Sequence, residues 1–211
     1  MIYQKQMKLK YPINLHKGLT FIFVLSLMFY FNVFHESIWL YLALHGTYGI
    51  LWIAKDLLFP DKQWDRKVSI GYGLFTFFGL TLYWISPLII VWKPQPLSPE
   101  LMAGVVTLNI AGVFLHFGSD AQKYFSLKYN SGKLITEGFF KRTRNANYLG
   151  ELMIYLSFAL LSQHWVPILV IILFFSVVFV PNMVKKDRSL SRYTEFEVYK
   201  KSSGFFLPKL F

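Results

Sequence analysis

Residues 166–183 read VPILVIILFFSVVFVPNM, and this stretch, which holds no charged side chain, decides the class of the protein. About 20 consecutive apolar residues are enough to cross the hydrocarbon core of a bilayer. The run shows no period-two alternation, and a backbone in lipid must satisfy its own hydrogen bonds, so a helix is favoured over a strand. Five further stretches have the same character: Leu19–Phe34, Ile38–Phe59, Ile70–Trp92, Leu101–Phe117 and Leu149–Leu161. The sequence therefore predicts an all-α, polytopic membrane helix bundle with about six transmembrane helices.

The composition supports this prediction. Of the 211 residues, 55% are hydrophobic and 16% are charged, whereas about 25% of the residues of a typical soluble domain are charged. Cysteine is absent, which excludes disulfides, a thiolate nucleophile and a cysteine-ligated metal. The five histidines are scattered along the chain, so no metal site is expected.

The distribution of charge predicts the orientation. If the spans alternate, 21 of the 22 Lys and Arg residues fall on the side of the N-terminus, and only Lys93 falls on the other side. This is the positive-inside pattern, which places both termini on the inner side. It also accounts for the net charge of +11 without a nucleic-acid partner. We expect a single integral membrane domain over residues 1–211, with four spans in residues 1–117 and a distinct C-terminal region in residues 118–211.

Polar side chains are densest where the fifth apolar stretch begins. If a helix starts near Asn145, then Arg144, Asn147, Tyr148 and Glu151 share one face. A basic group beside the free N–H groups of a first helical turn attracts an anion such as a phosphate. The alternative is that Arg144 pairs with Glu151 and extends to the membrane surface.

Three more clusters carry chemistry. Lys185 and Arg188 share a basic face after the last span, where contact with anionic lipid headgroups is the alternative role. The 118–148 loop holds Asp120, Lys123 and Lys133. In the second span, Tyr48, Trp52 and Lys55 share a face and follow His45, and a buried Tyr or His beside a cavity is able to donate a proton.

Together these clusters resemble the C-terminal half of the membrane-embedded steroid 5-alpha-reductase family. Relatives of that family are the sterol reductases and the isoprenylcysteine and phospholipid methyltransferases. The resemblance covers residues 118–211 and lies in Ser119-Asp120, the segment 144–151 (RNANYLGE), Asp187, and a tail of Tyr193–Tyr199 followed by Phe206-Leu207-Pro208.

The resemblance implies a membrane reductase in which NADPH lies in an inner-facing cavity and an apolar lipid or steroid-like enone is the substrate. Tyr48 is the nearest counterpart of the family's catalytic Tyr. The family's catalytic Glu has no intramembrane counterpart before residue 100, so His45 is the alternative proton donor. The positions carried over as cofactor contacts are Asp120, Lys123, Lys133, Arg144, Asn147, Tyr148, Glu151, Asp187 and Arg188.

Two other functions stay open. One is an S-adenosylmethionine-dependent methyltransferase acting on a lipid or an isoprenylcysteine, although the Arg-His-Pro-x-Tyr pattern of those enzymes reads Arg-Asn-Ala-Asn-Tyr here. The other is a non-catalytic, lipid-binding accessory subunit that needs no cofactor and associates with the subunits of a larger membrane complex. The reductase would lie in the endoplasmic reticulum or a bacterial-type inner membrane, with the mitochondrial inner membrane as the alternative. Membrane lipids are expected partners in every case.

Overall fold

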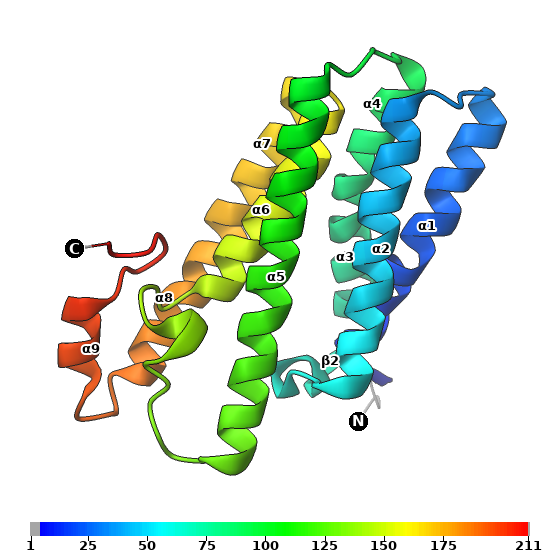
Figure 1. The fold of residues 1–211 in the computed structure, drawn as a ribbon. Coiled ribbons are helices and arrows are strands. Elements are labelled where there is room, and N and C mark those ends of the chain that lie inside the picture. The colour runs from blue at the N-terminus through cyan, green and yellow to red at the C-terminus, as the bar shows by residue number, and fades with distance from the viewer. Residues whose placement is uncertain (1–4, 211) are drawn as a thin grey trace. The chain divides into compact units, whose positions relative to one another are not determined.

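Helices form most of residues 5–210, the part of the chain that the structure, a computed structural model, describes (Figure 1). In chain order the elements are β1 (Gln6–Lys8), α1 (Lys10–Phe31), α2 (Glu36–Leu58), a 3-10 turn (Lys62–Asp65), β2 (Lys67–Ser69), α3 (Ile70–Leu80), a 3-10 turn (Thr81–Trp84), α4 (Ile85–Trp92), α5 (Pro99–Tyr129), a 3-10 turn (Gly138–Phe140), α6 (Ala146–Leu161), α7 (Trp165–Phe174), a π-helical turn (Phe175–Phe179), α8 (Val180–Leu190) and α9 (Phe196–Ser202).

Five helical segments of the described chain are long and apolar enough to cross a bilayer. They are α1, α2, the run Ile70–Trp92 through α3 and α4, α5, and the run Trp165–Leu190 through α7 and α8. α6 is apolar but has only 16 residues. The prediction of an all-α, polytopic membrane helix bundle is confirmed, with five long spans and a shorter sixth helix. That both termini face the inner side stays a prediction, and Met1 and Phe211 lie outside the described residues.

Two helix boundaries differ most from those that hydropathy indicates. α1 begins at Lys10 instead of Leu19, and α5 ends at Tyr129 instead of Phe117. Hydropathy marks where a helix is apolar, whereas its end is set by caps and by helix-breaking residues. Pro12 lies in the first turn of α1, where a missing N–H does no harm, and residues 118–129 contain no proline that would stop α5.

The π-helical turn precedes Pro181. Proline lacks a backbone N–H and its ring crowds the preceding turn, so the regular hydrogen-bond ladder is interrupted there. The last long span therefore continues through a local irregularity into the basic segment at its end, and α8 carries Lys185 and Arg188 as a helix, as predicted.

Contacts divide the described chain into two compact units. The first comprises residues 5–106 and 158–170, and the second comprises residues 107–157 and 171–210.

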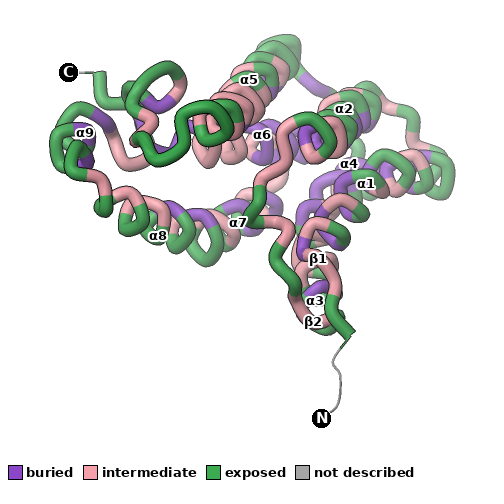
Figure 2. The backbone as a smooth tube through the Cα atoms, turned by 90° about the horizontal axis from the view of Figure 1, so that it is seen from below, coloured by how far each residue is buried: buried purple, intermediate pink, exposed green. Residues whose placement is uncertain are grey.

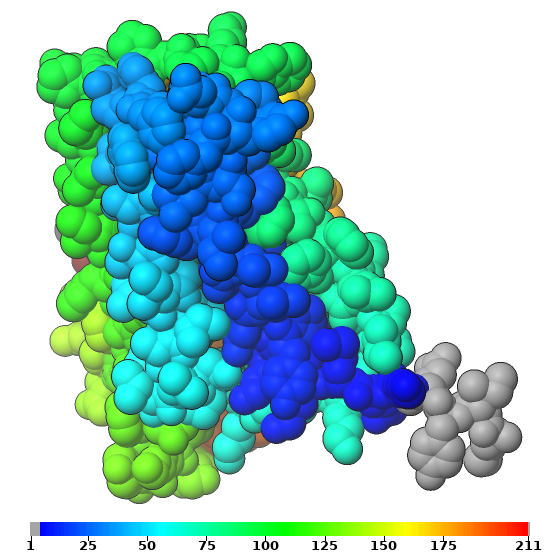
Figure 3. Space-filling view, turned by 90° about the vertical axis from the view of Figure 1, so that its right-hand side faces the viewer, coloured from blue at the N-terminus to red at the C-terminus, as the bar shows by residue number. Residues whose placement is uncertain are grey.

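In the first unit, α1 packs along α2 (Figure 3). Two glycines of α2 allow this close approach, because a Cβ on Gly46 would lie 2.6 Å from the ring of Phe21 and a Cβ on Gly49 would collide with the carbonyl oxygen of Lys17. The antiparallel pair of β1 and β2, with Met7 opposite Val68, joins the chain before α1 to the chain before α3.

In the second unit, α5 and α6 approach closely at another pair of glycines. A Cβ on Gly112 would lie 2.8 Å from the carbonyl oxygen of Gly150, and a Cβ on Gly150 would lie 2.5 Å from the backbone nitrogen of His116. One turn further on, Asn109 donates a hydrogen bond to Ser157 (Nδ2 to Oγ, 2.9 Å). Buried positions are frequent in α6, whereas α8 is exposed or half-buried except at Met183 (Figure 2). The start of α6 is thus held firmly on α5.

Candidate functional site

The start of α6 is built as the sequence predicts. Asn145 precedes the first helical residue, and its carbonyl oxygen accepts a hydrogen bond from the backbone N–H of Leu149 (3.1 Å). The backbone N–H of Asn145 donates to the hydroxyl of Thr143 (3.3 Å), which turns the chain into the helix.

A segment far along the chain, residues 203–209, lies beside this start, and we call it the tail strap. The backbone N–H of Arg144 donates to the carbonyl of Gly204 (3.0 Å), and that of Gly204 donates to the carbonyl of Arg142 (2.9 Å). Only glycine fits at position 204, because a Cβ there would collide with the carbonyl oxygen of Leu207. Two side-chain bonds complete the contact: Asn145 Nδ2 to Phe205 O (2.7 Å) and Thr143 Oγ1 to Phe206 O (2.9 Å).

α9 leads into the tail strap and is anchored by a buried tyrosine. The hydroxyl of Tyr199 donates to the carbonyl of Phe140 (2.7 Å), and Tyr199 is only 4% exposed. Burial disfavours the charged phenolate and raises the pKa of Tyr199 to about 12. This tyrosine therefore stays neutral and keeps its hydrogen bond throughout the physiological pH range.

Arg144 joins three parts of the second unit. Its Nε lies 3.0 Å from both carboxylate oxygens of Asp187 on α8, and its Nη1 donates to the carbonyl of Ser203 (2.7 Å). Lys186 donates in turn to the carbonyl of Arg144 (2.6 Å). The structure thus brings together two predicted site residues, Arg144 and Asp187. The partner of the guanidinium is Asp187 and not Glu151, the alternative considered from the sequence.

Two buried acceptors lie at the start of α6. The side-chain oxygens of Asn145 and Asn147 are buried and have no hydrogen-bond partner among the described residues. Asn145 as a whole is completely buried. A buried acceptor without a donor is costly, and in native proteins such an atom is usually satisfied by a water or a ligand. Asn145 was not among the residues chosen from the sequence, and its position before a helix start beside Asn147 is the signal that could have identified it.

His116 and Asp120 of α5 lie next to this point. The Nδ1 of His116 is 3.1 Å from the carbonyl oxygen of Asn147, and its Nε2 is 4.0 Å from a carboxylate oxygen of Asp120. His116 and Asp120 are 3% and 6% exposed. The predicted residue Asp120 therefore belongs to the same group as Asn147, through His116.

The other predicted cofactor contacts surround this group at greater exposure. Tyr148 is half-buried with its ring 5.3 Å from that of Phe179, and Glu151 and Lys123 are half-buried on α6 and α5. Lys133, in the loop after α5, and Arg188, on α8, are exposed, and their side chains form no hydrogen bond with other residues of the 5–210 range. They are available to an anion from solution.

The predicted catalytic residues lie in the first unit, on α2. His45 is completely buried; its Nδ1 is 2.7 Å from the hydroxyl of Tyr41, and its ring stacks on Phe158 at 4.1 Å. Tyr48 is also completely buried, and its hydroxyl lies 3.4 Å from the Nζ of Lys17. A lysine of α1 therefore lies at the Tyr48 hydroxyl.

Lys17 was missed as a site residue because the predicted first span begins at Leu19. The structure includes Lys17 in α1 and buries it to 3% exposure. Its Nζ lies 4.5 Å from the centre of the Tyr48 ring and 5.0 Å from that of Trp52. The predicted common face of Tyr48, Trp52 and Lys55 is confirmed, since the Nζ of Lys55 is 4.8 Å from the ring of Trp52.

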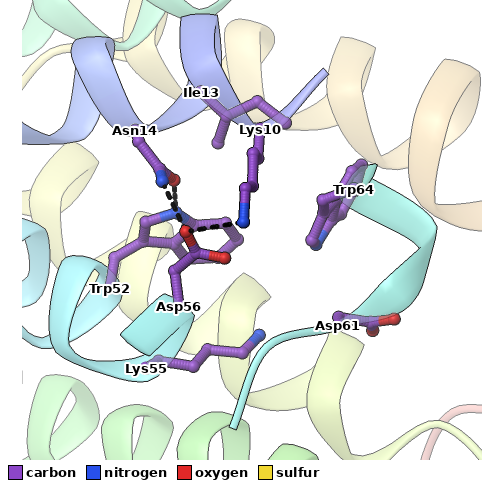
Figure 4. A pocket seen from close by; sticks show the side chains of 8 residues that line it. All are labelled: Lys10, Ile13, Asn14, Trp52, Lys55, Asp56, Asp61 and Trp64. Atoms are coloured by element: carbon purple, nitrogen blue, oxygen red, sulfur yellow. Dashed lines mark hydrogen bonds and ion pairs between the residues drawn. The ribbon is translucent and has the colours of Figure 1, made fainter. Parts of the chain in front are cut away.

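A small pocket opens beside Trp52 between the beginning of α1 and the end of α2 (Figure 4). Asn14 donates to Asp56 (2.9 Å) and accepts from the indole N–H of Trp52 (3.0 Å), and Lys10 lies 3.5 Å from Asp56. The pocket is lined by Lys10, Ile13, Asn14, Trp52, Lys55, Asp56, Asp61 and Trp64. Much of its polar lining is thus engaged in contacts that hold α1 to α2.

Comparison with known proteins adds one finding. Residues 56–205, more than half of the chain, match the model of a family described as "Protein of unknown function (DUF1295)". No curated protein matches the sequence.

Proposed function

The chain belongs to the DUF1295 family, and on that premise we propose that it is a membrane-embedded, NADPH-dependent reductase acting on the C=C bond of a lipid or steroid-like enone. The observation that carries the proposal is the pair of buried, unpartnered acceptors, Asn145 and Asn147, at the start of α6. Helix starts attract anions, and these acceptors add the ability to bind the N–H groups of an amide. The combination suits a ligand that has both an anionic group and an amide.

The residues present carry the chemical groups that binding of NADPH requires. The side-chain oxygens of Asn145 and Asn147 would accept hydrogen bonds from its carboxamide N–H groups, and Lys123, Lys133 and Arg188 would hold its phosphates. When bound, NADPH supplies a hydride. Arg144, which is engaged with Asp187 and the tail strap, would hold the walls of this site in place.

Tyr48 would supply the acid. A hydroxyl that donates a hydrogen bond to the carbonyl oxygen of an enone stabilises the negative charge that develops there as the hydride adds to the β-carbon. The same hydroxyl would then give its proton to the substrate. Tyr48 is completely buried, which would keep bulk water from its hydroxyl and suit a lipid substrate. The membrane in question would be the endoplasmic reticulum or a bacterial-type inner membrane, or alternatively the mitochondrial inner membrane.

A melting experiment on the detergent-solubilised protein tests the cofactor class. A ligand present at a hundredfold excess over its Kd stabilises the folded state by about 2.7 kcal/mol. We expect NADPH to raise the melting temperature and S-adenosylmethionine to leave it unchanged. We expect Asn147→Ala to reduce the NADPH shift, whereas the matched control Asn130→Ala, at an exposed position after α5, retains it.

The other outcomes distinguish the alternatives. A shift with S-adenosylmethionine and none with NADPH would favour the methyltransferase. No shift with either ligand, together with copurification of stable partner subunits from native membranes, would favour the accessory subunit.

A further inference from the structure

We propose that Lys17 is a positioning residue for Tyr48: its buried ammonium holds the Tyr48 hydroxyl and stabilises the phenol oxygen when that hydroxyl gives up its proton. The proposal rests on the proposed reductase function, because it assigns a second group to the same proton transfer.

The contact between the two side chains is close and enclosed. The Nζ of Lys17 lies 3.4 Å from the Tyr48 hydroxyl and 4.5 Å from the centre of its ring. Lys17 is 3% exposed and Tyr48 is completely buried. An ammonium held beside a phenol in such surroundings interacts with it much more strongly than it would in water.

The backbone fixes this contact. Gly49, the neighbour of Tyr48, lies directly against the carbonyl oxygen of Lys17, and a Cβ at position 49 would collide with it. α1 and α2 are therefore held together at the level of the two side chains. A lysine on a long, flexible stem loses entropy when it is fixed, and here the crossing of the two helices brings it close to the phenol.

His45 is the competing candidate, and its position argues against it. Its Nδ1 is engaged with the hydroxyl of Tyr41 at 2.7 Å, and its ring is stacked on Phe158. The rings of His45 and Tyr48 are tilted with their centres 6.3 Å apart. His45 thus orders the core beside Tyr48, while Lys17 reaches the hydroxyl.

The reduction of one enone consumes one hydride and one proton. The β-carbon of the enone accepts the hydride, the C=C bond breaks, and its electron pair moves toward the carbonyl oxygen as an enolate. The enolate takes the Tyr48 proton and becomes the saturated ketone after tautomerisation. The phenolate that remains lies beside the Lys17 ammonium until a proton from water restores the hydroxyl, so that enone, NADPH and one proton give saturated ketone and NADP⁺.

The test compares Lys17→Met, which keeps an unbranched side chain one atom shorter and removes the charge, with Lys17→Arg, which keeps the charge. Lys55→Met is the matched control, because Lys55 is also buried (4% exposed) and also lies over the Trp52 ring. NADPH oxidation is followed in lipid nanodiscs with progesterone as the probe enone, and NADPH affinity is measured separately. We expect Lys17→Met to lower kcat at least tenfold with NADPH affinity unchanged, Lys17→Arg to restore part of the loss, and Lys55→Met to change kcat less than twofold.

The double variant separates positioning from simple structural support. If Lys17 acts through Tyr48, Lys17→Met combined with Tyr48→Phe has the same kcat as Tyr48→Phe alone, since the group on which Lys17 acts is gone. A normal kcat for Lys17→Met, or a double variant at least tenfold slower than Tyr48→Phe, would overturn the proposal.

A spectroscopic measurement tests the contact between Lys17 and Tyr48 without relying on enzyme turnover. The protein is labelled with 3-fluorotyrosine, and its ¹⁹F resonance for Tyr48 is identified by its loss in Tyr48→Phe. We expect Lys17→Met to move this resonance and Lys55→Met to leave it in place; equal spectra for Lys17→Met and the wild type would refute the contact. A wild type that neither binds NADPH nor oxidises it with progesterone counts against the reductase function, whereas an unmoved resonance counts against Lys17.

Discussion

The guanidinium of Arg144 meets the carboxylate of Asp187 through Nε, 3.0 Å from both carboxylate oxygens, and through Nη2, 3.0 Å from Oδ2. The two residues are 43 positions apart, one before α6 and the other on α8. A planar guanidinium suits such a contact, which an ammonium cannot reproduce. With the bond to Ser203, this pair connects the helix that carries Asn147 to the tail strap.

Arg144→Lys should therefore loosen the tail strap although the charge is kept. Hydrogen bonds to charged groups contribute about 1.5–3 kcal/mol each. The loss of the guanidinium–carboxylate bonds should therefore make the chain after Lys200 and Lys201 accessible to trypsin and weaken NADPH binding. Cleavage is followed by mass spectrometry, with Arg192→Lys, at an exposed position just after α8, as the control. If NADPH affinity falls while the strap stays protected, Arg144 contacts the cofactor directly.

The crossing of α5 and α6 predicts a contrast between two glycines of one helix. Gly112→Ala places a methyl group 2.8–2.9 Å from backbone atoms of α6 and should lower the free energy of unfolding by about 1–3 kcal/mol. Gly104→Ala, also in α5, meets no atom within 4 Å and should be neutral or stabilising by up to about 1 kcal/mol. Denaturant unfolding in detergent measures both, and equal effects would show that the two helices do not meet at Gly112.

The sequence predicts the spans well because hydropathy is a local property, and the run at residues 166–183 is unambiguous. It also predicts the start of α6 at Asn145, since polar residues before an apolar run mark a helix start. The sequence does not predict the tail strap, because Gly204 and Arg144 lie 60 positions apart and no periodicity links them. Lys17 was missed because a lysine beside an apolar run is ordinarily taken as a flanking charge, and only the α1–α2 contact shows that it is buried.

The orientation of the spans predicts opposite sides for two exposed lysines. Lys62 follows α2 and Lys93 follows α4, so one predicted span separates them. Because the chain has no cysteine, Lys62→Cys and Lys93→Cys each introduce a single thiol that a membrane-impermeant maleimide can label in sealed vesicles. We expect Lys93→Cys to be labelled from the outer face and Lys62→Cys only after permeabilisation. Labelling of both from the same face would contradict the positive-inside orientation.

The buried Tyr199 predicts how attachment of the tail strap depends on pH. Its folded-state pKa of about 12 lies above the usual value near 10, so the neutral form is favoured by folding. The resulting stabilisation is fully present below pH 10 and is lost as the pH rises from 10 toward 12. The melting temperature of the wild type should therefore fall over this range more steeply than that of Tyr199→Phe, which lacks the ionisable hydroxyl and its bond to Phe140. Tyr129→Phe, at a tyrosine that is 70% exposed, serves as the control and should follow the wild type; a Tyr199→Phe protein that also follows it would show that the phenol of Tyr199 is not held in its neutral form by burial.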